Sequence, residues 1–144
     1  MQDQLVCEVT VPATPEWVFR ALTDPAELSN WWDSHDTTWA LDARLGGVWT
    51  SSGRDESCGP WSMHGVILEW DPDRLLGYSW NELVEYRPSL GPALVRYELD
   101  AAESGTRLRV THSGFEGYPE ALASYSQGWP FLLENLRAYA QKNM

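Results

Sequence analysis

The pattern of hydrophobic and polar positions predicts one strand, two short helices, a long β-rich region and a final helix. The first strand is clearest, because apolar side chains alternate with polar ones along residues 5–11. Side chains at every second position of a strand share one face. We therefore expect Leu5, Cys7, Val9 and Val11 to face inward.

Two short helices are expected directly after this strand. Thr14 can cap the first helix, and Pro15 lies where a missing N–H costs nothing. Asp24-Pro25 ends this helix and begins the second, because the residue before a proline is pushed out of the α region. The second helix closes on the aromatic pair Trp31-Trp32.

Six more strands are predicted between residues 37 and 112, and turn residues separate them. They are placed at 37–41, 44–53, 61–70, 75–80, 93–100 and 106–112. The segment 82–92 contains Pro88, Gly91 and Pro92, and is therefore expected to be a longer connection rather than a strand.

The final helix is predicted over residues 119–142. Its apolar side chains recur at steps of three and four, at Leu122, Tyr125, Trp129, Leu132, Leu136 and Ala140. Pro130 removes one backbone hydrogen bond inside this helix, so a kink is expected around residues 128–130. A curved antiparallel sheet with one long helix across its concave face would enclose a cavity of about 300–1,000 Å³, the scale of small-molecule sites.

Composition supports a single domain over residues 1–144 and narrows the partners. The chain contains nine tryptophans, more aromatic surface than a small core needs, which suggests that some of them line the cavity. The alternative is that several lie half exposed at strand ends. The formal net charge of −11 argues against nucleic acid and anionic membrane surfaces as partners.

The sequence gives no sign of a secretory signal, a metal or a cofactor. No apolar run approaches the roughly 18 residues of a membrane span, and a cytoplasmic location is expected. Cys7 and Cys58 are isolated, so a disulfide is possible but not favoured. His35, His64 and His112 lack the spacing of a metal site, and no glycine-rich phosphate loop is present, so no cofactor is predicted.

Several motifs spread over nearly the whole chain resemble one protein family. They are residues 11–25, Trp31-Trp32, Gly46 to Trp49, Gly65 to Trp80, Gly105 to Phe115 and Gly128-Trp129. Together they resemble the START-like (SRPBCC) superfamily, and within it the activator of heat-shock protein 90 ATPase homologue family of the C-terminal-domain type. The resemblance implies an α+β helix-grip fold, like that of START and Bet v 1 proteins, with a hydrophobic cavity under the last helix. It implies no single activity, because the superfamily includes lipid carriers, hormone receptors and aromatic polyketide cyclases.

His112 is the strongest candidate for a ligand-binding or catalytic residue. Alternation along its strand places it on the same face as Leu108 and Val110, toward the helix or the cavity. Such a histidine could bind a ligand carbonyl or act as a general base. It could equally be a structural histidine at the strand end. The residues expected to line the pocket are Trp49, Trp80, Tyr97, His112, Trp129 and Leu133.

Two other groups of polar residues are weaker candidates for catalysis than His112. Ser34, His35 and Asp36 are adjacent on a loop, where their side chains cannot converge as a nucleophile and its base require. Glu69, Glu82 and Glu85 could form the paired carboxylates of an acid–base site. The simpler interpretation is that these three glutamates are strand residues that face solvent.

Three functions follow from these observations. The first is binding of a small hydrophobic or aromatic molecule in the cavity. The second is a cyclase or hydrolase type of enzyme that uses His112 and a tyrosine such as Tyr97 in the same cavity. The third is an interaction module that activates a chaperone ATPase. Both a monomer and a homodimer are compatible with the sequence.

Overall fold

The computed structural model describes residues 3–32, 37–55 and 59–143. In these residues the strands are β1 (Gln4–Val11), β2 (Thr38–Leu41), β3 (Val48–Asp55), β4 (Gly59–Asp71), β5 (Leu75–Val84), β6 (Ala93–Ala102) and β7 (Gly105–Ser113). The helices are α1 (Pro15–Thr23), α2 (Pro25–Trp31) and α3 (Pro119–Lys142). The predicted element order is confirmed.

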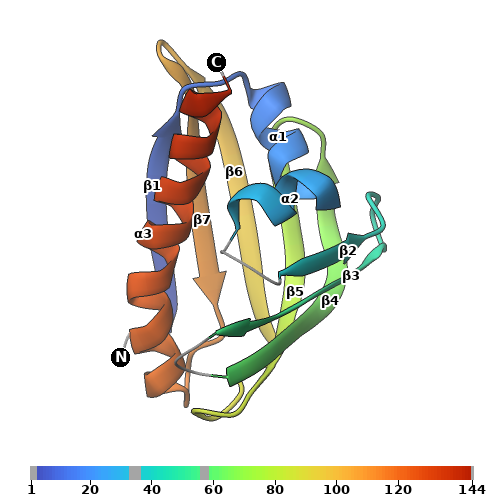
Figure 1. Cartoon of the computed structure of the whole chain (residues 1–144), viewed down its shortest axis with the longest axis vertical. Helices are drawn as coiled ribbons and strands as arrows, with labels where there is room; N and C mark the ends of the chain where they lie inside the picture. Colours follow the sequence, from blue (N-terminus) through green and yellow to red (C-terminus); the bar gives the residue numbers. More distant parts are fainter. Residues whose placement is uncertain (1–2, 33–36, 56–58, 144) are drawn as a thin grey trace.

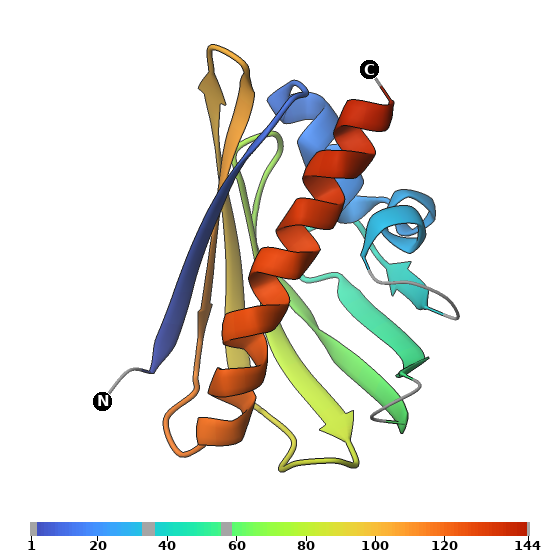
Figure 2. The same ribbon diagram turned by 60° about the vertical axis from the view of Figure 1, so that its left-hand side comes forward.

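The strands form one antiparallel sheet in the order β1-β7-β6-β5-β4-β3-β2. The sheet curves, and α3 lies across its inner face, while α1 and α2 close one end (Figures 1 and 2). This is the predicted α+β helix-grip arrangement. Because β1 pairs with β7, the chain places its first strand beside its last one, directly next to α3.

The starts of α1 and α2 follow from local sequence, as expected. The Trp17 backbone N–H donates to the Thr14 hydroxyl at 3.1 Å, and the Ala26 N–H donates to the Asp24 carboxylate at 3.0 Å. Each helix has proline in its first turn. The Trp31 indole donates to the carbonyl of Ala21 at 2.9 Å, which ties the second helix to the first.

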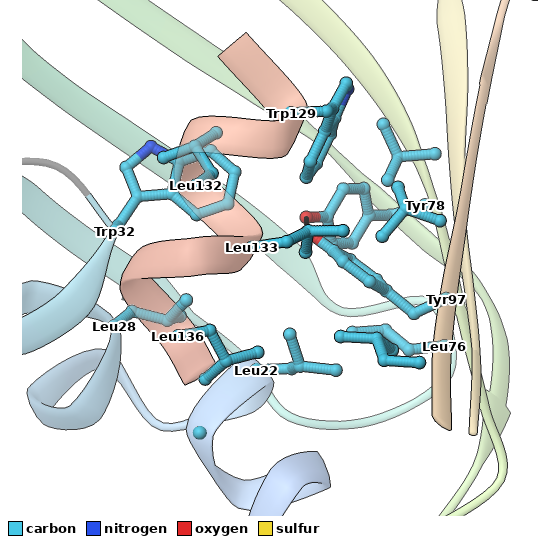
Figure 3. Packing of buried hydrophobic residues seen from close by; sticks show 14 of the residues in the cluster. Leu22, Leu28, Trp32, Leu76, Tyr78, Tyr97, Trp129, Leu132, Leu133 and Leu136 are labelled. Atoms are coloured by element: carbon cyan, nitrogen blue, oxygen red, sulfur yellow. Dashed lines mark hydrogen bonds between the residues drawn. The ribbon is translucent and has the colours of Figure 1, made fainter. Parts of the chain in front are cut away.

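Side chains fill the space between the middle of α3 and the sheet. Trp129 and Leu133 point from α3 toward Tyr78 and Tyr97 on the sheet (Figure 3). The two tyrosine hydroxyls lie 3.1 Å apart, and both tyrosines are buried. Leu132 turns instead toward Trp32 at the end of α2 (Figure 3). The region under the centre of the helix is therefore packed core.

One predicted element boundary differs in the structure, and another agrees. The segment 82–92 was expected to be a connection, but β5 continues to Val84, so Glu82 is a strand residue and the connection is shorter. Glu82 N–H donates to the carbonyl of Leu90 at 3.0 Å, which folds this connection back against the strand. Helix α3 has the predicted bounds and continues through Pro130. A bend at this proline stays a prediction.

Gly65 in β4 allows a tryptophan to reach across the strand. The Trp49 indole on β3 donates to the carbonyl of Ser79 on β5 at 3.0 Å, and Gly65 lies between them in the register. A Cβ atom at Gly65 would lie 1.8 Å from that carbonyl oxygen and 2.5 Å from the indole nitrogen. Only glycine leaves room for this partly buried hydrogen bond.

We therefore expect Gly65→Ala to lower the free energy of unfolding by about 2–3 kcal/mol, because the methyl group overpacks the site and displaces the Trp49 hydrogen bond. Chemical denaturation measures this change. The matched control is Val66→Thr, an exposed neighbour, with an expected change within about 0.5 kcal/mol. Equal effects of the two substitutions would show that the close approach at Gly65 is unimportant.

Candidate functional site

A pocket of about 430 Å³ opens beside the packed core, between α3 and the strands β4 and β5. We call it the side pocket. Trp61 and Met63 of β4 and Trp80 of β5 form its sheet wall. Trp32, at the C-terminal end of α2, also lines the pocket. The side pocket thus lies at one side of the last helix and not under its centre, where the cavity was expected.

The helix wall of the side pocket is formed by Tyr125, Gly128, Phe131 and Leu132. At Gly128 there is room for a side chain, because a Cβ atom there would touch only the Tyr125 ring, at 3.9 Å. Glycine inside a helix costs about 1 kcal/mol relative to alanine. No close contact in the described residues requires glycine here.

A buried ion pair forms the polar end of the pocket. The Glu82 carboxylate accepts hydrogen bonds from Arg87 Nη1, from the Tyr125 hydroxyl and, at 2.9 Å, from the Leu90 backbone N–H. The side chains of Glu82 and Arg87 are 1% and 4% exposed. We call Glu82, Arg87 and Tyr125 the Glu82 cluster. The interpretation of Glu82 as a solvent-facing residue is wrong, because β5 turns it to the same inner face as Trp80.

The contacts within the Glu82 cluster raise the pKa of both Arg87 and Tyr125. Burial alone would lower the pKa of the Arg87 guanidinium, but its hydrogen bond to Glu82 and the charge of that carboxylate outweigh burial and raise it. The pKa of the Tyr125 hydroxyl lies well above its ordinary value, because of burial and then because of the charge of Glu82 and the hydrogen bond to it. The Arg87 charge and the Trp80 N–H act in the opposite direction on Tyr125. At neutral pH Arg87 is therefore charged, and the Tyr125 hydroxyl keeps its proton and donates a hydrogen bond to the Glu82 carboxylate.

Four buried side-chain nitrogens lack a hydrogen-bond partner among the described residues. They are Trp39 Nε1, Trp80 Nε1, Arg87 Nε and His112 Nε2. A buried donor left unpaired costs about 1–3 kcal/mol. Two of the four, Trp80 and Arg87, belong to residues that line the side pocket, but these two nitrogen atoms are themselves buried. The Trp80 N–H lies close enough to the Tyr125 hydroxyl to lower its pKa, so it faces that group.

His112 lies in the core and is not among the residues that line the pocket. It is fully buried, and its Nδ1 accepts the Trp129 indole N–H at 2.9 Å. The rings of Phe115 and Tyr125 pack on it, with centroids 4.7 and 4.9 Å away. Burial lowers the pKa of His112 to about 3. Of the two interpretations of His112, these contacts fit the structural one, with a side chain as its partner instead of the backbone.

The buried neutral state of His112 makes stability depend on pH. Its pKa is about 3 in the folded chain, against 6.5 for the ordinary side chain, so between these values the unfolded chain binds a proton that the folded chain excludes. Its contribution is therefore present above about pH 6.5 and is lost as the pH falls. We expect wild type to lose about 3 kcal/mol more than His112→Gln between pH 7 and pH 4. Denaturation curves of both proteins at both pH values measure this difference, and parallel pH profiles would contradict it.

Of the six residues expected to line the pocket, only Trp80 does so. Trp49, Tyr97, Trp129 and Leu133 are buried in the core, at 1% exposure or less, as is His112. The inward direction of Trp80 and Tyr97 is confirmed. Sequence reasoning missed Glu82 and Arg87. Alternation from Tyr78 through Trp80 gave a signal for Glu82, whereas nothing in the pattern marked Arg87, which lies in the connection after β5.

The remaining polar candidates lie elsewhere. Glu69 pairs with Arg96 at 3.1 Å on the surface, and Glu85 is exposed. Ser34, His35, Asp36 and Cys58 fall outside the described residues. Within the described part of the chain, no three His, Cys, Asp or Glu side chains gather as metal ligands would, and no helix is long and apolar enough to cross a membrane.

The chain matches a known protein family over most of its length. A family model described as "Activator of Hsp90 ATPase homolog 1-like protein" matches residues 12–141, which is most of the chain. This agrees with the resemblance carried by the sequence motifs. Among proteins with curated descriptions, none matches the chain.

Several solved structures share the fold at low sequence identity. Mll3558 from Rhizobium loti is 27% identical with a TM-score of 0.80, over 94% of each chain. Ms6760 from Mycobacterium smegmatis is 15% identical with a TM-score of 0.82, over 98% of this chain and 92% of that one. DynU16, a protein in the dynemicin biosynthetic locus, is 21% identical with a TM-score of 0.79, over 99% of this chain and 49% of that one.

Proposed function

The chain belongs to the family of activator of Hsp90 ATPase homolog 1-like proteins, and from this premise we propose that it binds a small apolar or aromatic molecule in the side pocket. The observation that carries the proposal is the aromatic pocket beside α3. DynU16, which shares the fold, is a protein in a biosynthetic locus, and this is consistent with a small-molecule role for the architecture.

Size and lining both support a small apolar ligand. The volume of about 430 Å³ falls within the range of about 300–1,000 Å³ that is typical of ligand pockets. Phe131 and Tyr86 line the pocket, and they are 58% and 47% exposed. A bound apolar molecule would remove part of this aromatic surface from water, which is favourable in proportion to the area buried.

The described contacts favour binding over the enzyme that uses His112 and Tyr97. His112 is paired with Trp129, and the Tyr97 hydroxyl lies next to that of Tyr78. Neither residue lines the side pocket. An acid–base mechanism needs its groups within hydrogen-bond reach of the substrate. The pair proposed for catalysis therefore lacks access to a molecule in this pocket.

Gly128→Leu tests the proposal. A leucine side chain at this position would extend into the open pocket, so we expect the affinity for 2-isopropylnaphthalene to fall by about tenfold or more. Equilibrium dialysis measures the affinity. The fold should be retained, because leucine is a better helix former than glycine; circular dichroism and thermal unfolding check this.

Ala123→Leu is the matched control, because it adds a similar side chain at an exposed position of α3. Its affinity for 2-isopropylnaphthalene should stay within about twofold of wild type. If Gly128→Leu binds the hydrocarbon as tightly as wild type does, the side pocket is not the binding site.

A further inference from the structure

We propose that the outer face of the sheet binds a second copy of this chain, so that the protein forms a weak two-fold dimer through four exposed aliphatic residues. They are Val48 on β3, Val66 and Leu68 on β4, and Leu94 on β6, and we call them the outer patch. This inference goes beyond the proposed function, because the outer patch lies on the face of the sheet that points away from α3 and the side pocket (Figures 1 and 2).

The residues of the outer patch lie side by side. Val48 and Val66 are direct partners in the register of β3 and β4. The Val66 backbone N–H donates to the Ser79 hydroxyl at 2.9 Å, and Ser79 is the register partner of Leu94. Leu68 follows Val66 by two positions and is exposed like it. The patch therefore crosses four neighbouring strands, with Ser79 between Val66 and Leu94.

The outer patch faces water in the single chain. Its residues are between 38% and 58% exposed. The three described helices lie on the inner face or at one end of the sheet, so none of them covers it (Figures 1 and 2). Single exposed apolar residues are common on protein surfaces, whereas a contiguous apolar patch marks an interaction site. The outer patch is therefore a candidate interface.

The charges of the outer face restrict the kind of partner. The outward side chains of β2, of β3 from Val48 to Ser52, of β4 from Ser62 to Leu68 and of β5 from Gly77 to Leu83 include no Asp, Glu, Lys or Arg. The outer face on β1, β6 and β7 differs, because it carries charges such as the exposed pair of Glu8 and Arg109. A partner recognised by charge needs opposite charges across the interface. The neutral part of the face offers none, so its partner must present a neutral surface as well.

A second copy of the chain meets this requirement. In a two-fold dimer both copies present the same surface, so the neutral face of one copy lies against the neutral face of the other. Each copy carries a formal net charge of −11, and two copies repel each other wherever their acidic surfaces come close. Contact through the neutral face keeps these charges apart. Two sheets can pack face to face in this way at a separation of about 10 Å.

The size of the neutral face predicts a weak dimer. With strands about 4.8 Å apart and a rise of about 3.3 Å per residue, the neutral part of β2–β5 together with Leu94 covers roughly 400–500 Å² on each copy. The total of roughly 800–1,000 Å² is below the roughly 1,600 Å² of a standard stable interface and is in the range of transient ones. We therefore expect a dissociation constant on the order of 0.1 mM.

Sedimentation equilibrium of the wild-type chain at pH 8 tests the inference. Between about 5 µM and about 500 µM chain, the weight-average mass should rise from that of the monomer toward that of the dimer. Because salt screens the repulsion between two acidic chains, the dissociation constant should fall by about threefold or more between about 0.05 M and about 0.5 M NaCl. A contact held by opposite charges would weaken over the same range instead.

Val66→Lys places a charge at the centre of the outer patch. In the dimer this charge would be removed from water without a counter-charge, so the dissociation constant should rise by about tenfold or more. Leu94→Lys, on a different strand, should have the same effect, so the test does not depend on the folding of one variant. Circular dichroism checks the fold of both.

Ala123→Lys is the matched control, because it adds the same charge at an exposed position of α3, on the other side of the sheet (Figure 2). Its dissociation constant should stay within about twofold of wild type.

Three results would overturn the inference. They are a chain that stays monomeric at the highest concentration in both salt conditions, a dimer that dissociates as salt rises, and a dimer that both Val66→Lys and Leu94→Lys leave intact. Each of these results leaves the proposed function of the side pocket in place, because that function is tested by ligand affinity and not by mass.

Discussion

Replacement of Trp129 by alanine is expected to lower the free energy of unfolding by about 3–5 kcal/mol, the range for removing a large buried aromatic side chain. Trp129 is 1% exposed and packs against Trp32, Trp80 and Tyr97. Its loss would also leave Nδ1 of the buried His112 without a donor. Chemical denaturation with a fluorescence or circular dichroism signal measures the change.

Phe131→Ala, two positions along the same helix, separates stability from binding. Phe131 is 58% exposed and lines the side pocket, so its removal should change the free energy of unfolding by less than about 1 kcal/mol. The affinity for 2-isopropylnaphthalene should nevertheless fall by about threefold or more, because the ligand loses an aromatic wall. Destabilisation by Phe131→Ala as large as that by Trp129→Ala would contradict this division between core and pocket.

Glu82→Leu is expected to cost about 3–5 kcal/mol of unfolding free energy, because it leaves the Arg87 charge buried without its partner. Two further donors, the Tyr125 hydroxyl and the Leu90 N–H, would also lose their acceptor. Denaturation curves at neutral pH measure the effect. The double variant Glu82→Leu/Arg87→Met should recover part of the loss, since it removes the uncompensated charge.

The control for this substitution is Glu8→Leu in β1. Glu8 pairs with Arg109 at 3.1 Å, but these side chains are 44% and 53% exposed. Exposed ion pairs contribute little because water screens them, so a change below about 1 kcal/mol is expected. If Glu8→Leu costs as much as Glu82→Leu, the burial of the Glu82 cluster does not matter.

Local patterns in the sequence were enough to predict the fold. Alternation in residues 5–11, the capping residues Thr14 and Asp24, and the helical period of residues 119–142 each correspond to an element of the structure. These signals are local, because each depends on neighbouring residues that share one face or one turn. The resemblance carried by the family motifs then implied the helix-grip arrangement of these elements, and the order of the strands in the sheet comes from the structure.

The candidate site was harder to predict, because knowing which face of a strand points inward does not show which side chains line an open pocket. Alternation shows that Trp49 and Tyr97 point inward, but it cannot show whether other side chains fill the space in front of them. In the structure Trp80, Trp129 and Leu133 do so, and the open volume moves to one side of α3. Arg87 reaches the pocket through the connection after β5, a long-range arrangement that no periodic pattern records.

The claim that the side pocket binds a small apolar molecule is tested most directly by a titration with 2-isopropylnaphthalene. The measurement follows the tryptophan indole N–H signals in a ¹⁵N–¹H NMR spectrum. The account predicts that the signals of Trp61 and Trp80, which line the pocket, shift with saturation. The signals of Trp17 and Trp70, which pack against Tyr139 and Phe19 elsewhere in the fold, should stay in place. Shifts at Trp17 and Trp70 without shifts at Trp61 and Trp80, or no saturable shift at all, would contradict it.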